Sequence, residues 1–130
     1  MAQVGEPRPD WTETIPPMNL EVKAGSEAIH RPGSLSAART NDRNSATGQI
    51  YLAFTREGTQ KLDNDYTVFG QTFKGFDILD KLQNVRTAPN ERNELARPVE
   101  EAKIVDVVIE DAAKYKKDID AWKKQNAGKT

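Results

Sequence analysis

The sequence predicts a mainly β or α+β domain built from antiparallel strands, of the barrel type. Short apolar or β-branched runs recur between clusters of Gly, Asn and Asp, which is typical of strands and their turns. Only two segments have helical spacing, and no internal repeat or low-complexity tract appears. At 130 residues the chain is one domain in size, and we expect a domain over residues 1–111 followed by a lysine-rich amphipathic helix and tail over residues 112–130.

The first part of the chain is expected to be mostly extended loop. Five of the 7 prolines fall within residues 1–32, and each removes a backbone hydrogen-bond donor and fixes its own φ angle. A short alternating strand is expected to interrupt this loop at residues 19–23. The small residues 33–38 predict the next strand, since small side chains permit close approach of backbone or ligand.

Two strands and a short helix are expected in the middle of the chain. A polar loop over residues 39–48 leads into an apolar strand over residues 49–55, which begins with a bulky amide, Gln49. After another loop, residues 66–73 have the composition of a strand, and we expect these two consecutive strands to pair antiparallel. The apolar positions within residues 76–84 have helical spacing and predict a short amphipathic helix.

The C-terminal part is expected to contain a core strand and a helix. A charged loop over residues 87–101 precedes the β-branched run of residues 102–109, which predicts a core strand. Asp111 is the expected N-cap of the final helix, and one apolar stripe of that helix holds Tyr115, Ile119 and Trp122. Lysines fill its other face, where the interleaved acids Asp118 and Asp120 favour a solvated surface over a nucleic-acid contact.

Composition excludes several kinds of site. The chain has no cysteine, which excludes disulfides, thiolate metal sites and thiol nucleophiles. Its one histidine, His30, has no neighbours with ligand or nucleophile spacing, so we interpret it as a loop residue and expect neither metal nor cofactor. The net charge of -1 gives no overall attraction to nucleic acid. Without an apolar run long enough to span a bilayer or a secretory leader, we expect a soluble chain, with the cytoplasm favoured.

Two stretches resemble the cyclophilin family of peptidyl-prolyl cis-trans isomerases. They are "GSLSAARTNDRNSATGQIYLAFT" and "LDNDYTVFGQTFKGFDILDKL". In that family the motifs "G-x-L-S-M-A", "N-S-x-x-S-Q-F-F" and "L-D-x-x-H/Y-x-V-F-G" occur in the same order. The opening "MAQVGEP" is similar to the family's "F-M-x-Q-G-G-D-P". The resemblance covers residues 1–111 and implies a cyclophilin-like antiparallel β-barrel.

The resemblance also implies an activity and a set of site residues. Cyclophilins rotate an X-Pro peptide bond over a barrier of about 20 kcal/mol, which needs no nucleophile, metal or acid-base pair. Polar groups hold the peptide backbone while an apolar pocket holds the proline ring. The positions implied for catalysis are Gln3, Gln49 and Tyr51. The positions implied for substrate binding are Met1, Ala38, Arg39, Leu62 and Tyr66.

The chain departs from the family pattern in ways that bear on both fold and activity. The family's first three strands and first helix have no counterpart, so the expected barrel is incomplete. The missing part includes "F-H-R", whose arginine is the principal catalytic group of the family, and no arginine of this chain can be assigned that role. Ile50, Gly48 and Arg39 replace an aromatic residue, a serine and an asparagine of the family motifs.

An incomplete barrel leaves exposed strand edges, and three explanations stay open. The chain is a fragment of a longer protein, one half of a barrel that another subunit completes, or a reduced domain that closes by self-association. The last two are favoured because Met1 could be a true start. A second chain or another copy is therefore an expected partner.

Two functions follow from the resemblance. The first is a prolyl isomerase that acts on X-Pro bonds of peptides and unfolded protein, with the activity of the isolated chain left open by the missing arginine. The second is a non-catalytic module that binds proline-containing segments or serves as a structural subunit of an assembly.

Overall fold

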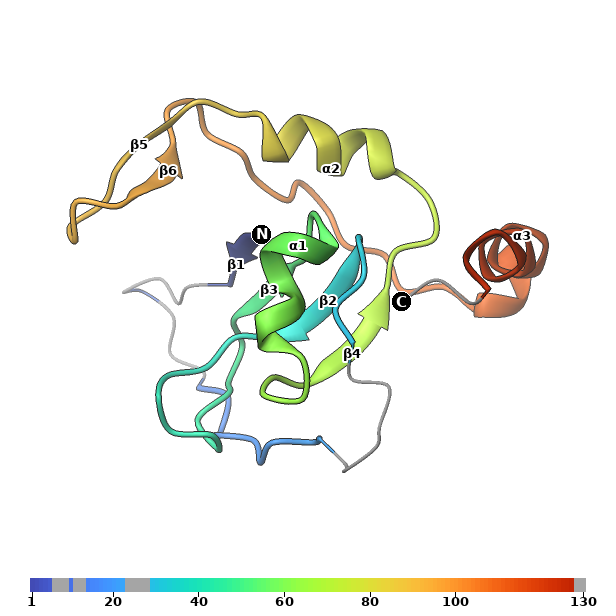
Figure 1. Cartoon of the computed structure of the whole chain (residues 1–130), viewed down its shortest axis with the longest axis horizontal. Coiled ribbons are helices and arrows are strands. Elements are labelled where there is room, and N and C mark those ends of the chain that lie inside the picture. Colours follow the sequence, from blue (N-terminus) through green and yellow to red (C-terminus); the bar gives the residue numbers. More distant parts are fainter. Residues whose placement is uncertain (6–9, 11–13, 23–28, 128–130) are drawn as a thin grey trace. The chain divides into compact units, whose positions relative to one another are not determined.

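The computed structural model describes residues 1–5, 10, 14–22 and 29–127 (Figure 1). The chain divides into two compact units, Met1–Thr72 and Phe73–Lys129, which are taken separately below. The expected domain boundary after residue 111 remains a prediction.

The first unit is built on a four-stranded antiparallel sheet with the strand order β1-β3-β2-β4 (Figure 1). Its strands are β1 (Ala2–Val4), β2 (Ser34–Ala37), β3 (Ile50–Leu52) and β4 (Val68–Gln71). Strands were expected at the positions of β2, β3 and β4, and these are confirmed. The expected pairing of the consecutive strands β3 and β4 is wrong, since β2 lies between them. The chain between them forms α1 (Arg56–Thr59) and the 3-10 turn η1 (Gln60–Leu62), which the sequence reading placed in a loop.

Small side chains form most of the core of this unit. Ser34, Ser36 and Ala37 of β2 are buried, and so is Ala53 just after β3. The one large apolar side chain among the buried residues of this sheet is Tyr51, at the centre of β3. Because small residues allow strands and loops to pack closely, the sheet encloses polar side chains that a bulkier core would exclude.

The strand expected at residues 19–23 is not formed by residues 19–22, and Lys23 lies outside the described residues. Side chains satisfy the backbone there: Leu20 N–H donates to Asn44 Oδ1 at 2.9 Å and Glu21 N–H donates to Thr67 Oγ1 at 3.0 Å. These bonds to side chains 24 and 46 residues away in the chain take the place of a ladder of strand hydrogen bonds. Conversely, β1 lies in a stretch expected to be loop, where pairing with β3 sets its conformation.

The second unit holds the other helices and a two-stranded hairpin. Its elements are α2 (Phe76–Gln83), β5 (Thr87–Pro89), β6 (Leu95–Pro98), the 3-10 turn η2 (Ala112–Tyr115) and α3 (Lys116–Asn126). The two expected helices are confirmed. Asp111 was predicted as the N-cap of the final helix, and it caps the 3-10 turn η2 that leads into α3, where its side chain accepts a hydrogen bond from Ala113 N–H at 2.9 Å. The helix α3 itself begins after Tyr115, which makes no side-chain cap. No helix of the described residues is long and apolar enough to cross a membrane.

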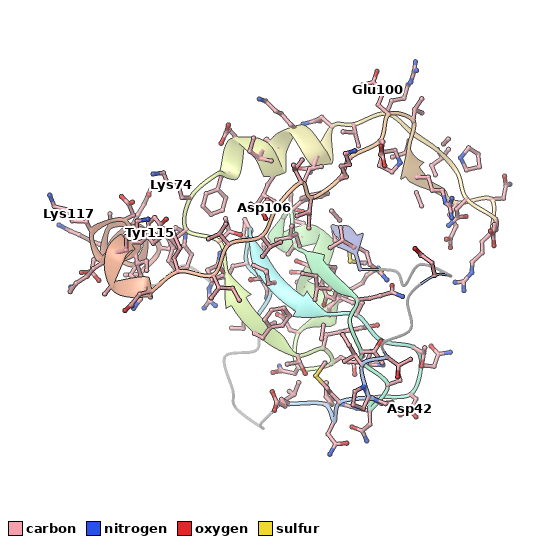
Figure 2. All side chains as sticks on the ribbon, turned by 180° about the vertical axis from the view of Figure 1, so that it is seen from behind. Asp42, Lys74, Glu100, Asp106, Tyr115 and Lys117 are labelled. Carbon is pink, nitrogen blue, oxygen red and sulfur yellow. The ribbon has the colours of Figure 1, made fainter. Side chains whose placement is uncertain are left out.

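Specific turn chemistry forms the hairpin β5–β6 inside the expected charged loop. The Asn90 side chain accepts from the backbone of Arg92 and Glu94, and Asn93 adopts a positive φ of 60°. Asparagine tolerates this backbone region and supports such turns. At the other end of the unit, Tyr115 packs against Phe73 with ring centroids 5.8 Å apart, and Lys117 points outward from the helix (Figure 2).

The strand expected at residues 102–109 is wrong. These residues form no strand and follow an irregular path that contains Asp106 (Figure 2). The five β-branched side chains are exposed by 60% to 96%, and they are Ile104, Val105, Val107, Val108 and Ile109. A β-branched run fits a strand only where neighbouring strands cover it, and no described strand pairs with this one. The described strands accordingly form an open sheet and a hairpin, not a closed barrel.

Candidate functional site

A pair of glutamines lies at the β1 edge of the sheet. Gln3 on β1 donates from Nε2 to Oε1 of Gln49, at 2.6 Å. Gln49 directly precedes β3, whose register with β1 places Gln3 opposite Tyr51. Chain positions 46 residues apart therefore present two side-chain amides together.

A glycine contact sets the geometry of this pair. Gly5, directly after β1, has a φ of +94°, and a Cβ atom there would lie 2.5 Å from the carbonyl oxygen of Gly48. Only glycine combines that backbone conformation with so close an approach. The end of β1 thus packs directly on the residue before Gln49.

Tyr51 lies on β3 between Gln3 of β1 and Ser36 of β2. Gln3, Tyr51 and Ser36 are direct cross-strand neighbours on β1, β3 and β2, so their side chains share one face. The Tyr51 side chain is only 2% exposed, and this burial raises its pKa to about 12. The phenol therefore keeps its proton at neutral pH and acts as a hydrogen-bond donor.

Tyr51 donates into a buried polar array that was not foreseen. Its hydroxyl lies 2.6 Å from Nε2 of His30, a residue with 0% exposure. On the other side of the imidazole, Nδ1 lies 3.1 Å from Oδ1 of Asp63, which also accepts the His30 backbone N–H at 2.8 Å. The interpretation of His30 as a loop residue is confirmed, since it lies outside the helices and strands. The sequence did not indicate that it is fully buried and hydrogen-bonded at both ring nitrogens. The available signal was the tyrosine, whose hydroxyl needs a partner when buried.

Arg56 completes the array. Its Nη2 lies 2.6 Å from Oδ2 of Asp63, and its Nη1 donates to the backbone carbonyl of His30 at 3.2 Å. Burial raises the pKa of Asp63, but the hydrogen bonds from Arg56 and from the backbone and side chain of His30 outweigh it and lower the pKa to about 2. Asp63 is therefore ionised at neutral pH.

Arg39 and Tyr66 extend the aromatic part of the site. The rings of Tyr51 and Tyr66 meet edge to face, at 84° with centroids 5.9 Å apart. The guanidinium carbon of Arg39 lies 4.3 Å from the centre of the Tyr66 ring, a cation–π geometry. Arg39 also donates to the backbone carbonyl of Asp65 from Nε and Nη2, and its side chain is only 6% exposed.

The other three expected site residues, Ala38, Leu62 and Met1, differ in how far they are buried. Ala38 is buried and donates its backbone N–H to the carbonyl of Gln49 at 2.9 Å. Leu62 is half-buried at the end of η1, next to Asp63, while Met1 is exposed before β1. Nowhere in the described part of the chain do three or more His, Asp or Glu side chains gather in a way that could hold a metal ion.

Comparison with known proteins decides the family. The family described as cyclophilin type peptidyl-prolyl cis-trans isomerase/CLD matches residues 1–109. The chain belongs to the cyclophilin family. The matched range includes the whole sheet of the first unit and the exposed run of residues 102–109.

Three proteins named as peptidyl-prolyl cis-trans isomerases are similar to this chain. Peptidyl-prolyl cis-trans isomerase A of Dickeya dadantii is 35% identical over 79 residues, which are 57% of this chain and 40% of the relative. A peptidyl-prolyl cis-trans isomerase of Acinetobacter baylyi is 30% identical over 93 residues, 69% of this chain and 49% of the relative. Peptidyl-prolyl cis-trans isomerase CYP71 of Arabidopsis thaliana is 32% identical over 112 residues, 84% of this chain and 16% of the relative. The chain thus spans half or less of the length of each of these relatives.

Proposed function

We propose that this cyclophilin chain carries a prolyl isomerase site that accelerates cis-trans rotation of X-Pro bonds in peptides and unfolded protein. The observation that carries the proposal is the contact between the side-chain amides of Gln3 and Gln49, since Gln3 is the cross-strand neighbour of Tyr51. A site for this reaction has to hold a peptide backbone on one side and a proline ring on the other. Polar amides beside an aromatic side chain meet both requirements.

The glutamine pair suits a peptide group. The bond between them uses Nε2 of Gln3 and Oε1 of Gln49, so the amide donor of Gln49 and the amide acceptor of Gln3 remain on the two partners. A peptide unit presents the complementary carbonyl acceptor and N–H donor. In the proposed complex the glutamine pair holds the substrate backbone on one side of the X-Pro bond. The other side of the bond can then rotate while this side stays in place.

Tyr66 and Leu62 are proposed to form the apolar wall for the proline ring, with the buried Tyr51 supporting Tyr66 from behind and Met1 at the exposed margin. Tyr66 contacts Tyr51 edge to face and is itself only partly covered, so it offers aromatic surface to a ligand. Ala38 and Arg39 are proposed to bind the substrate backbone nearby. The reaction forms no covalent intermediate. The site accelerates it by binding the twisted transition state of the X-Pro bond more tightly than the planar cis and trans states.

The arginines near the site already have partners. Arg39 donates to the carbonyls of Asp65 and Thr40, and Arg56 is held by Asp63 and the His30 carbonyl. Neither is placed to donate to a prolyl nitrogen without giving up these bonds. The proposed acceleration by this chain therefore comes from holding the substrate backbone and the proline ring, and a partner that completes the barrel is proposed to add such a donor.

The run of residues 102–109 is the proposed contact for that partner. In a strand conformation Val105, Val107 and Ile109 would lie on one face, and all three are largely exposed. A second chain or another copy of this one that adds a strand would cover this apolar row and give its backbone groups hydrogen-bond partners. Sedimentation velocity over a range of concentrations tests closure by another copy, which requires a concentration-dependent dimer.

The test of the isomerase proposal is exchange NMR on a short Ala-Pro peptide, with the full chain and its Gln49→Ala variant. We expect faster cis-trans exchange with the wild-type chain and about a tenfold loss in the variant, since one or two substrate hydrogen bonds are removed. Gln83→Ala, an exposed glutamine at the end of α2, is the matched control and should retain the wild-type rate. Peptide binding without acceleration would contradict the isomerase and support the non-catalytic module.

A further inference from the structure

The Tyr51 hydroxyl ties the aromatic wall of the site to a buried histidine. Phenylalanine would fill the same space in β3, but only a hydroxyl gives the ring the 2.6 Å contact with His30 Nε2. The two rings are nearly parallel, at 9°, with centroids 5.7 Å apart. This one contact fixes both the tilt and the depth of the Tyr51 ring.

The chemistry of the neighbours assigns the proton positions. An ionised carboxylate only accepts hydrogen bonds, so the 3.1 Å contact between Asp63 Oδ1 and His30 Nδ1 requires a proton on Nδ1. In the neutral imidazole Nε2 is then the acceptor, and the Tyr51 hydroxyl is the donor. The tautomer of His30 and the direction of the Tyr51 bond are thus set by Asp63.

Arg56 holds Asp63 and His30 against each other. One of its nitrogens pairs with Asp63 Oδ2 at 2.6 Å and another donates to the His30 carbonyl at 3.2 Å. The three residues come from the segment before β2, the start of α1 and the residue after η1. Since each is bonded to the other two, the imidazole has little freedom to turn.

We propose that His30, oriented by Asp63 and Arg56, is a positioning residue that fixes the Tyr51 ring, and through it Tyr66, for binding of the proline ring. The substrate half of this inference rests on the proposed function. His30 touches no substrate, because it is fully buried and both ring nitrogens are occupied inside the protein. Its effect on binding has to pass through the Tyr51 hydroxyl.

The first measurement is a long-range ¹H–¹⁵N NMR spectrum of the His30 imidazole in the full chain, which reports which ring nitrogen carries the proton. We expect a single neutral tautomer with the proton on Nδ1, and a shifted Nε2 signal in the Tyr51→Phe variant. A proton on Nε2, or two tautomers in exchange, would overturn the assignment. This measurement needs no substrate and no variant of His30.

The second measurement is a double-mutant cycle on affinity for the Ala-Pro peptide. His30→Gln and Tyr51→Phe should each lower affinity about fivefold, and the double variant should lose about the same factor, since both changes break one link. Tyr115→Phe removes a phenol hydroxyl bonded to Glu110 in the second unit, and should leave affinity unchanged. A purely structural histidine would instead give multiplied losses in the double variant, which would overturn the proposal, as would unchanged affinity in both single variants.

Failure of the proposed function is distinguishable from failure of this inference. If the wild-type chain binds no prolyl peptide, the proposed function is wrong, and the same cycle is then measured on the free energy of unfolding. Coupling between His30→Gln and Tyr51→Phe in that cycle, together with the Nδ1 tautomer, would retain His30 as the residue that positions Tyr51. Additive losses of the free energy of unfolding in the double variant would show that His30 does not position Tyr51 either. If His30→Gln does not fold, the tautomer and the Tyr51→Phe spectrum decide alone.

Discussion

The sheet of the first unit and the run of residues 102–109 invert the usual distribution of side chains. Within the sheet, the buried positions of β2 hold Ser34, Ser36 and Ala37, and Ala53 beside it has 0% exposure. The run of residues 102–109 holds the strongest strand-forming sequence of the chain, yet Ile109 is 96% exposed. The weaker strand former is in the centre of a sheet, and the stronger one is unpaired.

The difference shows that pairing decides where a strand forms. β2 has a poor strand composition but neighbours on both sides, β3 and β4, which satisfy its backbone groups. Residues 102–109 have the composition but no described neighbour, so nothing offsets the loss of conformational freedom on extension. The small residues of β2 also leave room for the array of His30, Tyr51 and Asp63, where every polar ring or carboxylate atom has a partner. Such an array stabilises only when it is complete.

The largest effect is expected from closing the space at Gly5. Gly5→Ala places a Cβ 2.5 Å from the Gly48 carbonyl oxygen at a φ of +94°, so β1 has to move. We expect a loss of about 3 kcal/mol in the stability of the β1–β3 pairing, from backbone strain and the clash together. Hydrogen exchange of the β1 and β3 amides measures this loss.

The matched control for Gly5→Ala is Gly75→Ala in the second unit. Gly75 has a similar φ of +88°, but a Cβ there would meet no atom within 4 Å. The cost is then the backbone conformation alone, about 1 kcal/mol. Equal losses in the two variants would show that the packing of β1 on Gly48 contributes nothing.

A smaller effect is expected from acid. The pKa of Asp63 is lowered from an ordinary 3.8 to about 2, so its stabilisation is complete above about pH 4 and is lost as the pH falls towards 2. The difference corresponds to about 2 kcal/mol. Urea unfolding at several pH values should show this extra acid sensitivity in the wild type and its absence in Asp63→Asn. Asp80→Asn, an exposed aspartate of α2, should keep the wild-type profile; loss of the acid sensitivity there too would remove Asp63 as its source.

Local patterns predicted the elements whose causes are local. The apolar spacing of residues 76–84 gave α2, and the Asp111 side chain gave the N-cap of η2. The strand order β1-β3-β2-β4 could not be predicted in this way, because it depends on pairing between distant segments. For the same reason the run of residues 102–109 was predicted as a strand: its composition is visible in the sequence, but the absence of a described partner is not.

The candidate site also has a part that the sequence predicted and a part that only the structure showed. Resemblance to cyclophilins selected Gln3 and Gln49, which the structure brings into contact although their roles stay predictions. Nothing in the spacing around His30 indicated its partners, which lie 21 and 33 residues away in the chain. A buried tyrosine in place of a phenylalanine was the only local sign of the array, and it required a structure to show which acceptor it meets.

The smallest effect on folding is expected in the exposed run of residues 102–109, where five β-branched side chains are 60% to 96% exposed. Val107→Lys should change the free energy of unfolding by less than about 0.5 kcal/mol, because the side chain is 73% exposed. Ala53→Val, which adds two methyl groups at a fully buried position, should cost about 1–3 kcal/mol. Val107→Lys should at the same time abolish any dimer seen by sedimentation, since a charge would enter the apolar row that a partner strand covers. If instead Val107→Lys destabilised the isolated chain as much as Ala53→Val, residues 102–109 would be packed within the chain itself, and the contrast between paired and unpaired strand formers would be lost.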